Sequence, residues 1–190
     1  MRKASSVEGL ARRAKEAART LARTPTAVKD KALREMARAI RRTSGSILRV
    51  NRSEVAAARA AGKPAAFLDR LALDEKRIES IAQGLLRVAQ LPDPVGKTED
   101  FSIRPNGLKI RKMRVPLGVI AVIYESRPGV TADAAGLCLK SGNACILRGG
   151  SEAARTNTLI ADALAAGLKA AGLPAGSVGF LRDRDRSAVR

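Results

Sequence analysis

The stretch that decides the fold of this chain is Val115-Pro-Leu-Gly-Val-Ile-Ala-Val-Ile-Tyr-Glu-Ser-Arg-Pro128. Its continuous apolar run, residues 119–124, is typical of a parallel strand that is buried on both faces of a sheet. A second apolar run, residues 144–147, predicts a neighbouring buried strand and leads into Arg148-Gly-Gly-Ser-Glu152. Polar loops that follow two such strands meet at the carboxyl edge of the sheet, where parallel sheets bind dinucleotides.

Working outward from these strands, the pattern alternates between strand and helix. Helices are expected at residues 131–140 and 153–171, and a third strand at residues 178–181. Strand, helix, strand, helix, strand is the repeating unit of a doubly wound sheet. The fold class is therefore α/β, with N-terminal helices, part of a doubly wound (Rossmann-like) parallel sheet, and a β-hairpin.

The hairpin precedes the sheet. Residues 101–104 and 108–115 flank Pro105-Asn-Gly107, and Asn-Gly is the strongest short signal for a tight two-stranded turn. The Pro- and Gly-containing segment Leu91-Pro-Asp-Pro-Val-Gly96 is a linker between the hairpin and the preceding helices.

The first ninety residues predict helices. Apolar side chains recur at helical spacing along residues 7–21, 28–40 and 67–90. The second stripe is expected to end near Ser44-Gly45. Asn51 followed by Glu54 resembles a capping box at the start of another helix, and Gly62-Lys-Pro64 is a typical stop.

The formal net charge is +18, from 36 Lys and Arg against 18 Asp and Glu. One interpretation is a polyanion partner, because clustered cations gain affinity by releasing counterions. The basic residues, however, occur in pairs such as Arg12-Arg13 that alternate with acids and alanines, and no aromatic residues interleave with the densest cluster, residues 109–114. We therefore favour cations spread over solvated helix faces, without a nucleic-acid partner.

Location and metal content follow from the same composition. The longest apolar stretch, residues 115–124, is too short to cross a bilayer, and the N-terminus lacks the apolar core of a signal peptide. Two Cys and no His give no basis for a disulfide framework or a metal site. A cytoplasmic protein with no membrane segment and no metal is the expectation.

Residues 148–151 are the physical candidates for an anion site. Arg148 offers a planar cationic fork to a phosphate, and Gly149-Gly150 lets the backbone approach a ligand closely. Ser151 could cap the following helix, whose positive N-terminus favours anions. The same residues also fit a plain strand-to-helix turn with a surface charge, and spacing alone leaves the two interpretations even.

Further stretches of the chain can be compared with a known family. They are Leu68-Asp-Arg-Leu-Ala72, Asp93-Pro-Val-Gly96, Val115-Pro-Leu-Gly-Val-Ile120, Tyr124-Glu-Ser-Arg-Pro128, Thr131-Ala-Asp133, Leu137-Cys-Leu-Lys-Ser-Gly-Asn143, Ile146-Leu-Arg-Gly-Gly-Ser-Glu152 and Leu173-Pro-Ala-Gly176. Together they resemble the first part of the glutamate-5-semialdehyde dehydrogenase (gamma-glutamyl phosphate reductase) family, a branch of the aldehyde dehydrogenase superfamily. The run from residue 115 to residue 152 is the most specific.

The resemblance implies reduction of L-glutamyl 5-phosphate to L-glutamate 5-semialdehyde by NADPH, a step of proline biosynthesis. In that family a Cys thiolate displaces phosphate to form a thioester, which hydride from the cofactor reduces. The residues that the resemblance places along the cofactor cleft are Tyr124, Glu125, Ser126, Arg148, Gly149, Gly150 and Ser151. Arg148 takes the place of a lysine that contacts the ribose, and Ser126 falls near the oxyanion-hole asparagine of the superfamily.

The resemblance also divides the chain. Residues 1–92 correspond to the helical part of the cofactor domain, 93–116 to the linker and a hairpin used for homo-oligomer formation, and 117–190 to an incomplete NADPH-binding unit. The catalytic domain with its nucleophilic Cys is expected beyond residue 190, so the chain alone is expected to be inactive.

Three hypotheses about function follow. Cys138 and Cys145 lie in apolar sequence, where burial raises a thiol pKa, so neither is expected to act as the nucleophile. The first hypothesis is therefore that the chain carries part of the cofactor domain of the reductase and lacks its nucleophile. The alternatives are a basic helical nucleic-acid-binding protein and a non-catalytic interaction protein that keeps the hairpin.

Overall fold

The computed structural model describes residues 7–182 of the protein. Its helices are α1 (Val7–Leu21), α2 (Thr26–Ala60), α3 (Ala65–Leu71), α4 (Glu75–Gln90), α5 (Pro128–Lys140) and α6 (Ala154–Ala170). Its strands are β1 (Thr98–Ile103), β2 (Lys109–Met113), β3 (Val119–Ile123), β4 (Ala144–Arg148) and β5 (Val178–Phe180). Two 3-10 turns, η1 (Ser151–Ala153) and η2 (Ala175–Ser177), precede α6 and β5.

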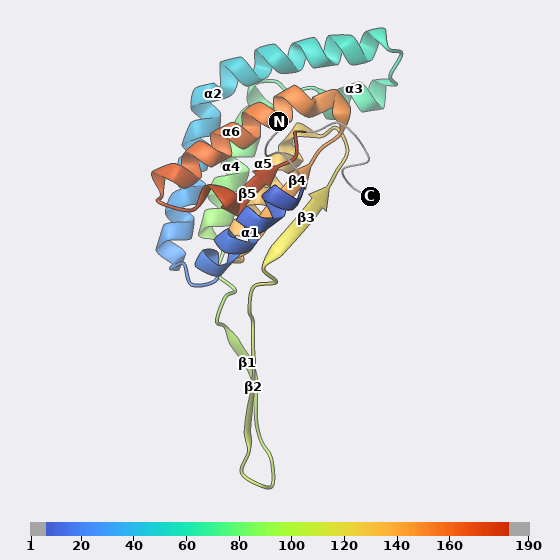
Figure 1. The fold of residues 1–190 in the computed structure, drawn as a ribbon. Coiled ribbons are helices and arrows are strands. Elements are labelled where there is room, and N and C mark those ends of the chain that lie inside the picture. Colours follow the sequence, from blue (N-terminus) through green and yellow to red (C-terminus); the bar gives the residue numbers. More distant parts are fainter. Residues whose placement is uncertain (1–6, 183–190) are drawn as a thin grey trace.

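Strands β3, β4 and β5 form a parallel sheet in that order. Helix α5 connects β3 to β4, and α6 connects β4 to β5 (Figure 1). The central strand β4 is buried, with Ala144, Cys145 and Leu147 fully covered. The α/β class predicted from the alternating pattern is thereby confirmed.

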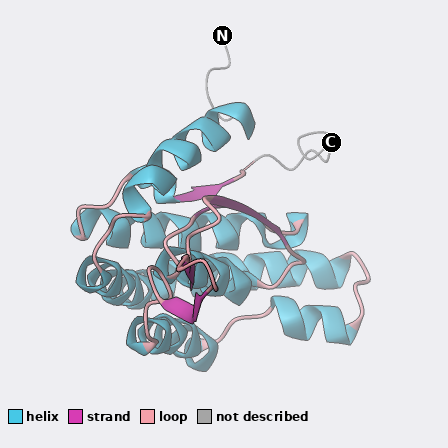
Figure 2. Ribbon diagram, turned by 90° about the horizontal axis from the view of Figure 1, so that it is seen from below, coloured by secondary structure: helices cyan, strands magenta, loops and turns pink. Residues whose placement is uncertain are grey.

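Helices cover both faces of this sheet (Figure 2). Helix α1 packs against all three strands on one face, while α5 packs on β4 and α6 on β5 from the other. Helices α2 and α4 form a further layer that contacts α5 and α6. One hydrophobic core joins these layers and contains side chains from α1, α2, α4, α5, β4 and α6.

Strand β3 lies at the edge of the sheet, and the prediction that it is buried on both faces was wrong. Its residues alternate between exposed and half-buried positions, and Ile123 is 59% exposed. An apolar run reports hydrophobicity but not strand order, and within residues 7–182 β3 pairs with β4 on one side only. Its last residue, Ile123, lines the candidate site described below.

Helix α2 is continuous over 35 residues and passes through Ser44-Gly45, where the sequence predicted an end. Gly45 is exposed and has no neighbouring atoms near the place of a Cβ. Its cost is therefore limited to the intrinsic propensity of glycine, about 1 kcal/mol. Burial of Ile40 before it and Ile47 after it outweighs that cost and carries the helix onward.

The predicted capping box was also wrong, because Asn51 and Glu54 both lie inside α2. The amide of Asn51 donates to the carbonyl of Leu71 at 3.0 Å and accepts from the N–H of Leu73 at 2.7 Å. It therefore fixes the connection between α3 and α4 against α2. The stop at Gly62-Lys-Pro64 is confirmed, since α2 ends at Ala60 and α3 begins at Ala65.

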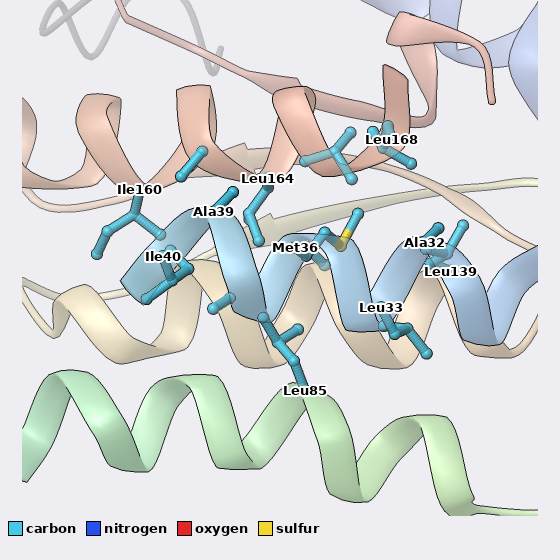
Figure 3. Packing of buried hydrophobic residues seen from close by; sticks show 14 of the residues in the cluster. Ala32, Leu33, Met36, Ala39, Ile40, Leu85, Leu139, Ile160, Leu164 and Leu168 are labelled. Atoms are coloured by element: carbon cyan, nitrogen blue, oxygen red, sulfur yellow. The ribbon is translucent and has the colours of Figure 1, made fainter. Parts of the chain in front are cut away.

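Helices α2 and α6 cross closely in the core (Figure 3). Met36 and Ile40 of α2 are fully buried near Ile160 and Leu164 of α6, and Leu85 of α4 lies below them in this view. A Cβ at Gly167 would lie 2.5 Å from the nitrogen and 2.6 Å from the Cα of Met36. The two backbones approach this closely because Gly167 has no side chain.

Two buried lysines connect α2, α4 and α5. The ammonium of Lys140 donates to Asp30 at 2.5 Å and to the carbonyl of Ala89 at 2.9 Å. Lys29 forms an ion pair with Asp93 and donates to the carbonyl of Lys140 at 3.2 Å. Because a buried charge is tolerated only when paired, these contacts fix the layers in one arrangement.

The predicted hairpin is confirmed, with β1 antiparallel to β2. Gly107, at φ 83°, permits the turn, and its N–H donates to the carbonyl of Arg104 at 2.8 Å. The hairpin projects away from the helices and the sheet (Figure 1). All residues of both strands are exposed, including the large apolar side chains of Phe101 and Ile103.

Candidate functional site

A cleft of about 520 Å³ opens where β3 and β4 end. Tyr124, Glu125 and Ser126, which follow β3, line it together with Arg148 and Gly150 at the end of β4. The structure thus brings together five of the seven residues that the family resemblance placed along a cofactor cleft. The position is the crevice at the carboxyl ends of neighbouring parallel strands, where such sheets bind their ligands.

The two glycines after β4 pack this turn against the loop after β3. A Cβ at Gly149 would meet the amide nitrogen of Asn157 and lie 3.0 Å from Cε2 of Tyr124. A Cβ at Gly150 would lie 2.8 Å from the backbone nitrogen of Ser126. Gly149 is therefore packed inside the structure and does not line the cleft. Gly150 permits the close contact between the turn after β4 and the loop after β3.

Tyr124 is fixed by a chain of hydrogen bonds. The hydroxyl of Tyr124 lies 2.7 Å from Oγ1 of Thr131, and Thr131 donates to Oδ1 of Asn157 at 3.3 Å. The backbone N–H of Tyr124 donates to the carbonyl of Arg148 at 3.0 Å. Burial raises the pKa of Tyr124 to about 12. The phenol is therefore protonated near neutral pH and holds the cleft wall in place.

Glu152 organises the loop that carries Ser126. The buried Ser126 hydroxyl donates to Oε2 of Glu152 at 3.0 Å, and Ser151 donates to the same oxygen at 3.1 Å. Lys63 binds Oε1 at 2.9 Å, and this bond is the main cause that lowers the pKa of Glu152 to about 2. Because Ser126 has committed its one proton, the oxyanion role for its hydroxyl stays a prediction without support from this arrangement.

The N-terminus of α6 is already occupied. Glu54 of α2 accepts hydrogen bonds from the backbone N–H of Arg155 at 2.8 Å and of Thr156 at 3.1 Å. The expectation that Ser151 caps this helix is wrong, because no side chain of the local segment does so and Ser151 bonds to Glu152 instead. The helix terminus expected to attract a ligand anion therefore holds a carboxylate of the protein.

Arginine side chains supply the free positive charge of the cleft. The Nε of Arg148 is buried and has no hydrogen-bond partner within the described residues. Arg70, in the last turn of α3, lines the same cleft, as do Phe67 and Glu152. The sequence prediction of the site missed Phe67, Arg70 and Glu152, although Arg70 and Glu152 lie in stretches that carried the family resemblance.

Neither cysteine is placed as a nucleophile. Cys138 and Cys145 are both free thiols in the core, as predicted, and neither lines the cleft. The hydrogen bond with Cys138 and the burial of the group both raise the pKa of Cys145. Both thiols are buried and line no part of the cleft, so neither has access to an acyl phosphate there.

Surface ion pairs occur on several elements, including Arg12 with Glu8, Arg41 with Glu79 and Arg182 with Asp162. Among residues 7–182, the helices lack the combination of length and apolar character that crossing a membrane requires.

Comparisons with known proteins agree with the fold. A curated gamma-glutamyl phosphate reductase of Methylorubrum populi is 52% identical over 181 residues, which are 95% of this chain and 42% of that protein. Crystal structures of gamma-glutamyl phosphate reductases superimpose with a TM-score of 0.92 for Thermotoga maritima, at 40% identity, and 0.85 for Saccharomyces cerevisiae, at 32%. They cover 97% and 96% of this chain, and the chain covers 45% and 48% of theirs.

The chain therefore spans less than half the length of these relatives. A profile of the aldehyde dehydrogenase family matches residues 1–190, which is the whole sequence. The helical layers, the parallel sheet and the projecting hairpin are all contained in the matched region. The chain belongs to the aldehyde dehydrogenase family.

Proposed function

We propose that this chain forms part of the cofactor-binding half of a gamma-glutamyl phosphate reductase, which reduces L-glutamyl 5-phosphate to L-glutamate 5-semialdehyde with NADPH in proline biosynthesis. The observation that carries the proposal is the 52% identity to such a reductase over 95% of the chain. The resemblance includes the two loops that line the cleft. The nucleic-acid-binding alternative has no comparable support.

The residues of the cleft fit a nicotinamide dinucleotide phosphate. The buried Nε of Arg148 has no acceptor among residues 7–182, and an anionic ligand group would satisfy it. The cleft of about 520 Å³ is within the range of ligand sites, roughly 300–1,000 Å³. Its place at the ends of β3 and β4 is the one that parallel sheets use for such ligands.

Each cleft residue then has a distinct role. NADPH, when bound, supplies the hydride for the reduction. Arg148 binds an oxygen of the cofactor's ribose or phosphate, and Glu125 lines the open side. Tyr124 and Ser126 keep the loop after β3 in position through their hydrogen bonds, while Gly150 lets that loop contact the turn after β4.

The rest of the sequence prediction belongs to the same proposal. The helical residues 1–92 and the unit at 117–190 act as one cofactor-binding part, and the hairpin within 93–116 assembles copies of the full reductase through its exposed apolar side chains. We assign the nucleophilic thiol to the remainder of such a reductase, because Cys138 and Cys145 are buried. The cytoplasmic location expected from the sequence is part of the proposal.

A chimera tests the proposed function. This chain replaces the matching 181 residues of the Methylorubrum populi reductase, and phosphate-dependent reduction of NADP by glutamate 5-semialdehyde is measured. We expect activity, and we expect Arg148→Ala to lower kcat/KM for NADP by roughly tenfold through loss of a charge-assisted contact. A chimera that folds and assembles like its parent but neither binds nor reduces NADP contradicts the proposal.

A further inference from the structure

Charge pairing within the cleft is uneven. Each acid that lines it has a cation of its own, Glu152 with Lys63 at 2.9 Å and Glu125 with Arg127 at 4.0 Å. Neither Arg70 nor Arg148 has an acidic partner or a hydrogen-bond acceptor for its guanidinium among residues 7–182. The two unpaired charges of the cleft are thus both positive.

These two arginines come from distant parts of the sequence. Arg70 belongs to the last turn of α3, and Arg148 ends β4. The α6 N-terminus, the usual alternative for binding a phosphate, is bonded to Glu54. An anionic group in this cleft therefore has the two guanidinium groups as its cationic partners.

The expected group is a phosphate monoester. Such a phosphate carries about −1.5 to −2 charges near pH 7 and three acceptor oxygens, whereas the 2′-hydroxyl of NADH is neutral. Sites for NADH present an acidic acceptor to the ribose, and sites for NADPH present an arginine. Here Oε2 of Glu152 already accepts two hydroxyl protons and Oε1 accepts Lys63, so the carboxylate is largely occupied.

We propose that Arg70, together with Arg148, binds the 2′-phosphate of the cofactor and that Arg70 determines the preference for NADPH over NADH. This inference rests on the proposed function and adds a residue from the helical N-terminal part to the site. Arg70 is exposed, so its contribution is a contact to bound phosphate and not a structural one. Two guanidinium groups bound to one phosphate fix its orientation more tightly than a single guanidinium group does.

The test is a titration of the ¹⁵N-labelled chain with adenosine 2′,5′-bisphosphate and, separately, adenosine 5′-monophosphate, followed by NMR. The Nε–H signals of Arg70 and Arg148 are expected to shift with the bisphosphate. Arg70→Ala should weaken bisphosphate binding about tenfold and leave the monophosphate unchanged, while Arg70→Lys keeps part of the effect. Arg34→Ala, which removes an exposed charge of α2 that lines no part of the cleft, is the matched control.

The outcomes separate the two proposals. If the bisphosphate binds better than the monophosphate and Arg70→Ala loses that preference, the inference holds. If the preference persists in Arg70→Ala, or if Arg34→Ala reduces it equally, the inference is overturned and the proposed function stands. If neither nucleotide shifts any signal of the cleft at millimolar concentration, the inference and the cofactor assignment to this cleft are both overturned.

Discussion

Replacing Gly167 by alanine tests the close crossing of α2 and α6. The added Cβ would lie 2.5 Å from the nitrogen and 2.6 Å from the Cα of Met36. Ordinary contacts of carbon atoms lie at about 3.5–4.0 Å, so the two helices have to separate by about 1 Å. Since the clash is with backbone atoms, no change of rotamer relieves it.

Gly45→Ala is the matched control, because both glycines lie inside helices. Alanine is favoured over glycine in a helix by about 1 kcal/mol, and nothing lies near a Cβ at Gly45. Gly45→Ala should therefore raise the free energy of unfolding by about 1 kcal/mol. In Gly167→Ala the same gain of about 1 kcal/mol is outweighed by an overpacking penalty of roughly 3 kcal/mol, so the free energy of unfolding should fall by about 2 kcal/mol.

Thermal and urea unfolding measure both effects. For a chain of this size, 1 kcal/mol corresponds to about 2–4 °C in Tm, so Gly45→Ala should melt a few degrees higher and Gly167→Ala roughly 4–8 °C lower. If Gly167→Ala is as stable as Gly45→Ala, the helices do not approach as described, and the argument from the missing side chain fails.

Three further predictions concern charge and thiols. Lys140→Ala should cost about 3 kcal/mol in urea unfolding, since it leaves a carboxylate and a carbonyl unpaired, whereas the exposed Lys169→Ala should change stability by less than about 0.5 kcal/mol. The pKa of Glu152 is lowered to about 2 in the fold, so its stabilisation is present above about pH 4.3 and is lost as the pH falls toward 2. Glu152→Gln should show a smaller fall in Tm over that range, and equal falls would argue against the ion pair with Lys63. Cys138 and Cys145 should react with a thiol reagent only as fast as the chain unfolds, and the chain alone should show no reverse activity; rapid labelling would contradict their burial.

The sequence predicted local structure well where the signal was itself local. The turn at Pro105-Asn-Gly107 and the stop at Gly62-Lys-Pro64 depend on the φ preferences of a few residues, and both occur as expected. Gly45 misled the prediction because its penalty, about 1 kcal/mol, is small beside the burial of the residues around it. Propensity identifies where a helix is weak, and tertiary packing decides whether it ends there.

The candidate site was predicted on one wall only. The loops after β3 and β4 lie next to apolar runs that the sequence displays, so Tyr124 and Arg148 could be found from pattern and resemblance. Arg70 lies within an ordinary helical pattern, which gives no sign of a binding role. Its presence in the cleft depends on how α3 folds back toward the sheet. Glu54 was likewise misassigned, since its role as the partner of the α6 N-terminus spans about one hundred positions.

The same long-range contacts connect stability to the cleft. Lys63 binds Glu152, which lines the cleft, and Glu54 binds the start of α6, so the helical N-terminal part contacts the strand-bearing part on both sides of residue 153. A separation of α2 from α6 at Gly167 would displace Arg70 relative to Arg148, because α3 follows α2 and the turn after β4 leads into α6. Gly167→Ala should therefore weaken binding of adenosine 2′,5′-bisphosphate as well as lower Tm, while Gly45→Ala raises Tm and leaves binding unchanged. Loss of stability in Gly167→Ala with unaltered binding would mean that the two walls of the cleft are positioned independently of the α2–α6 crossing.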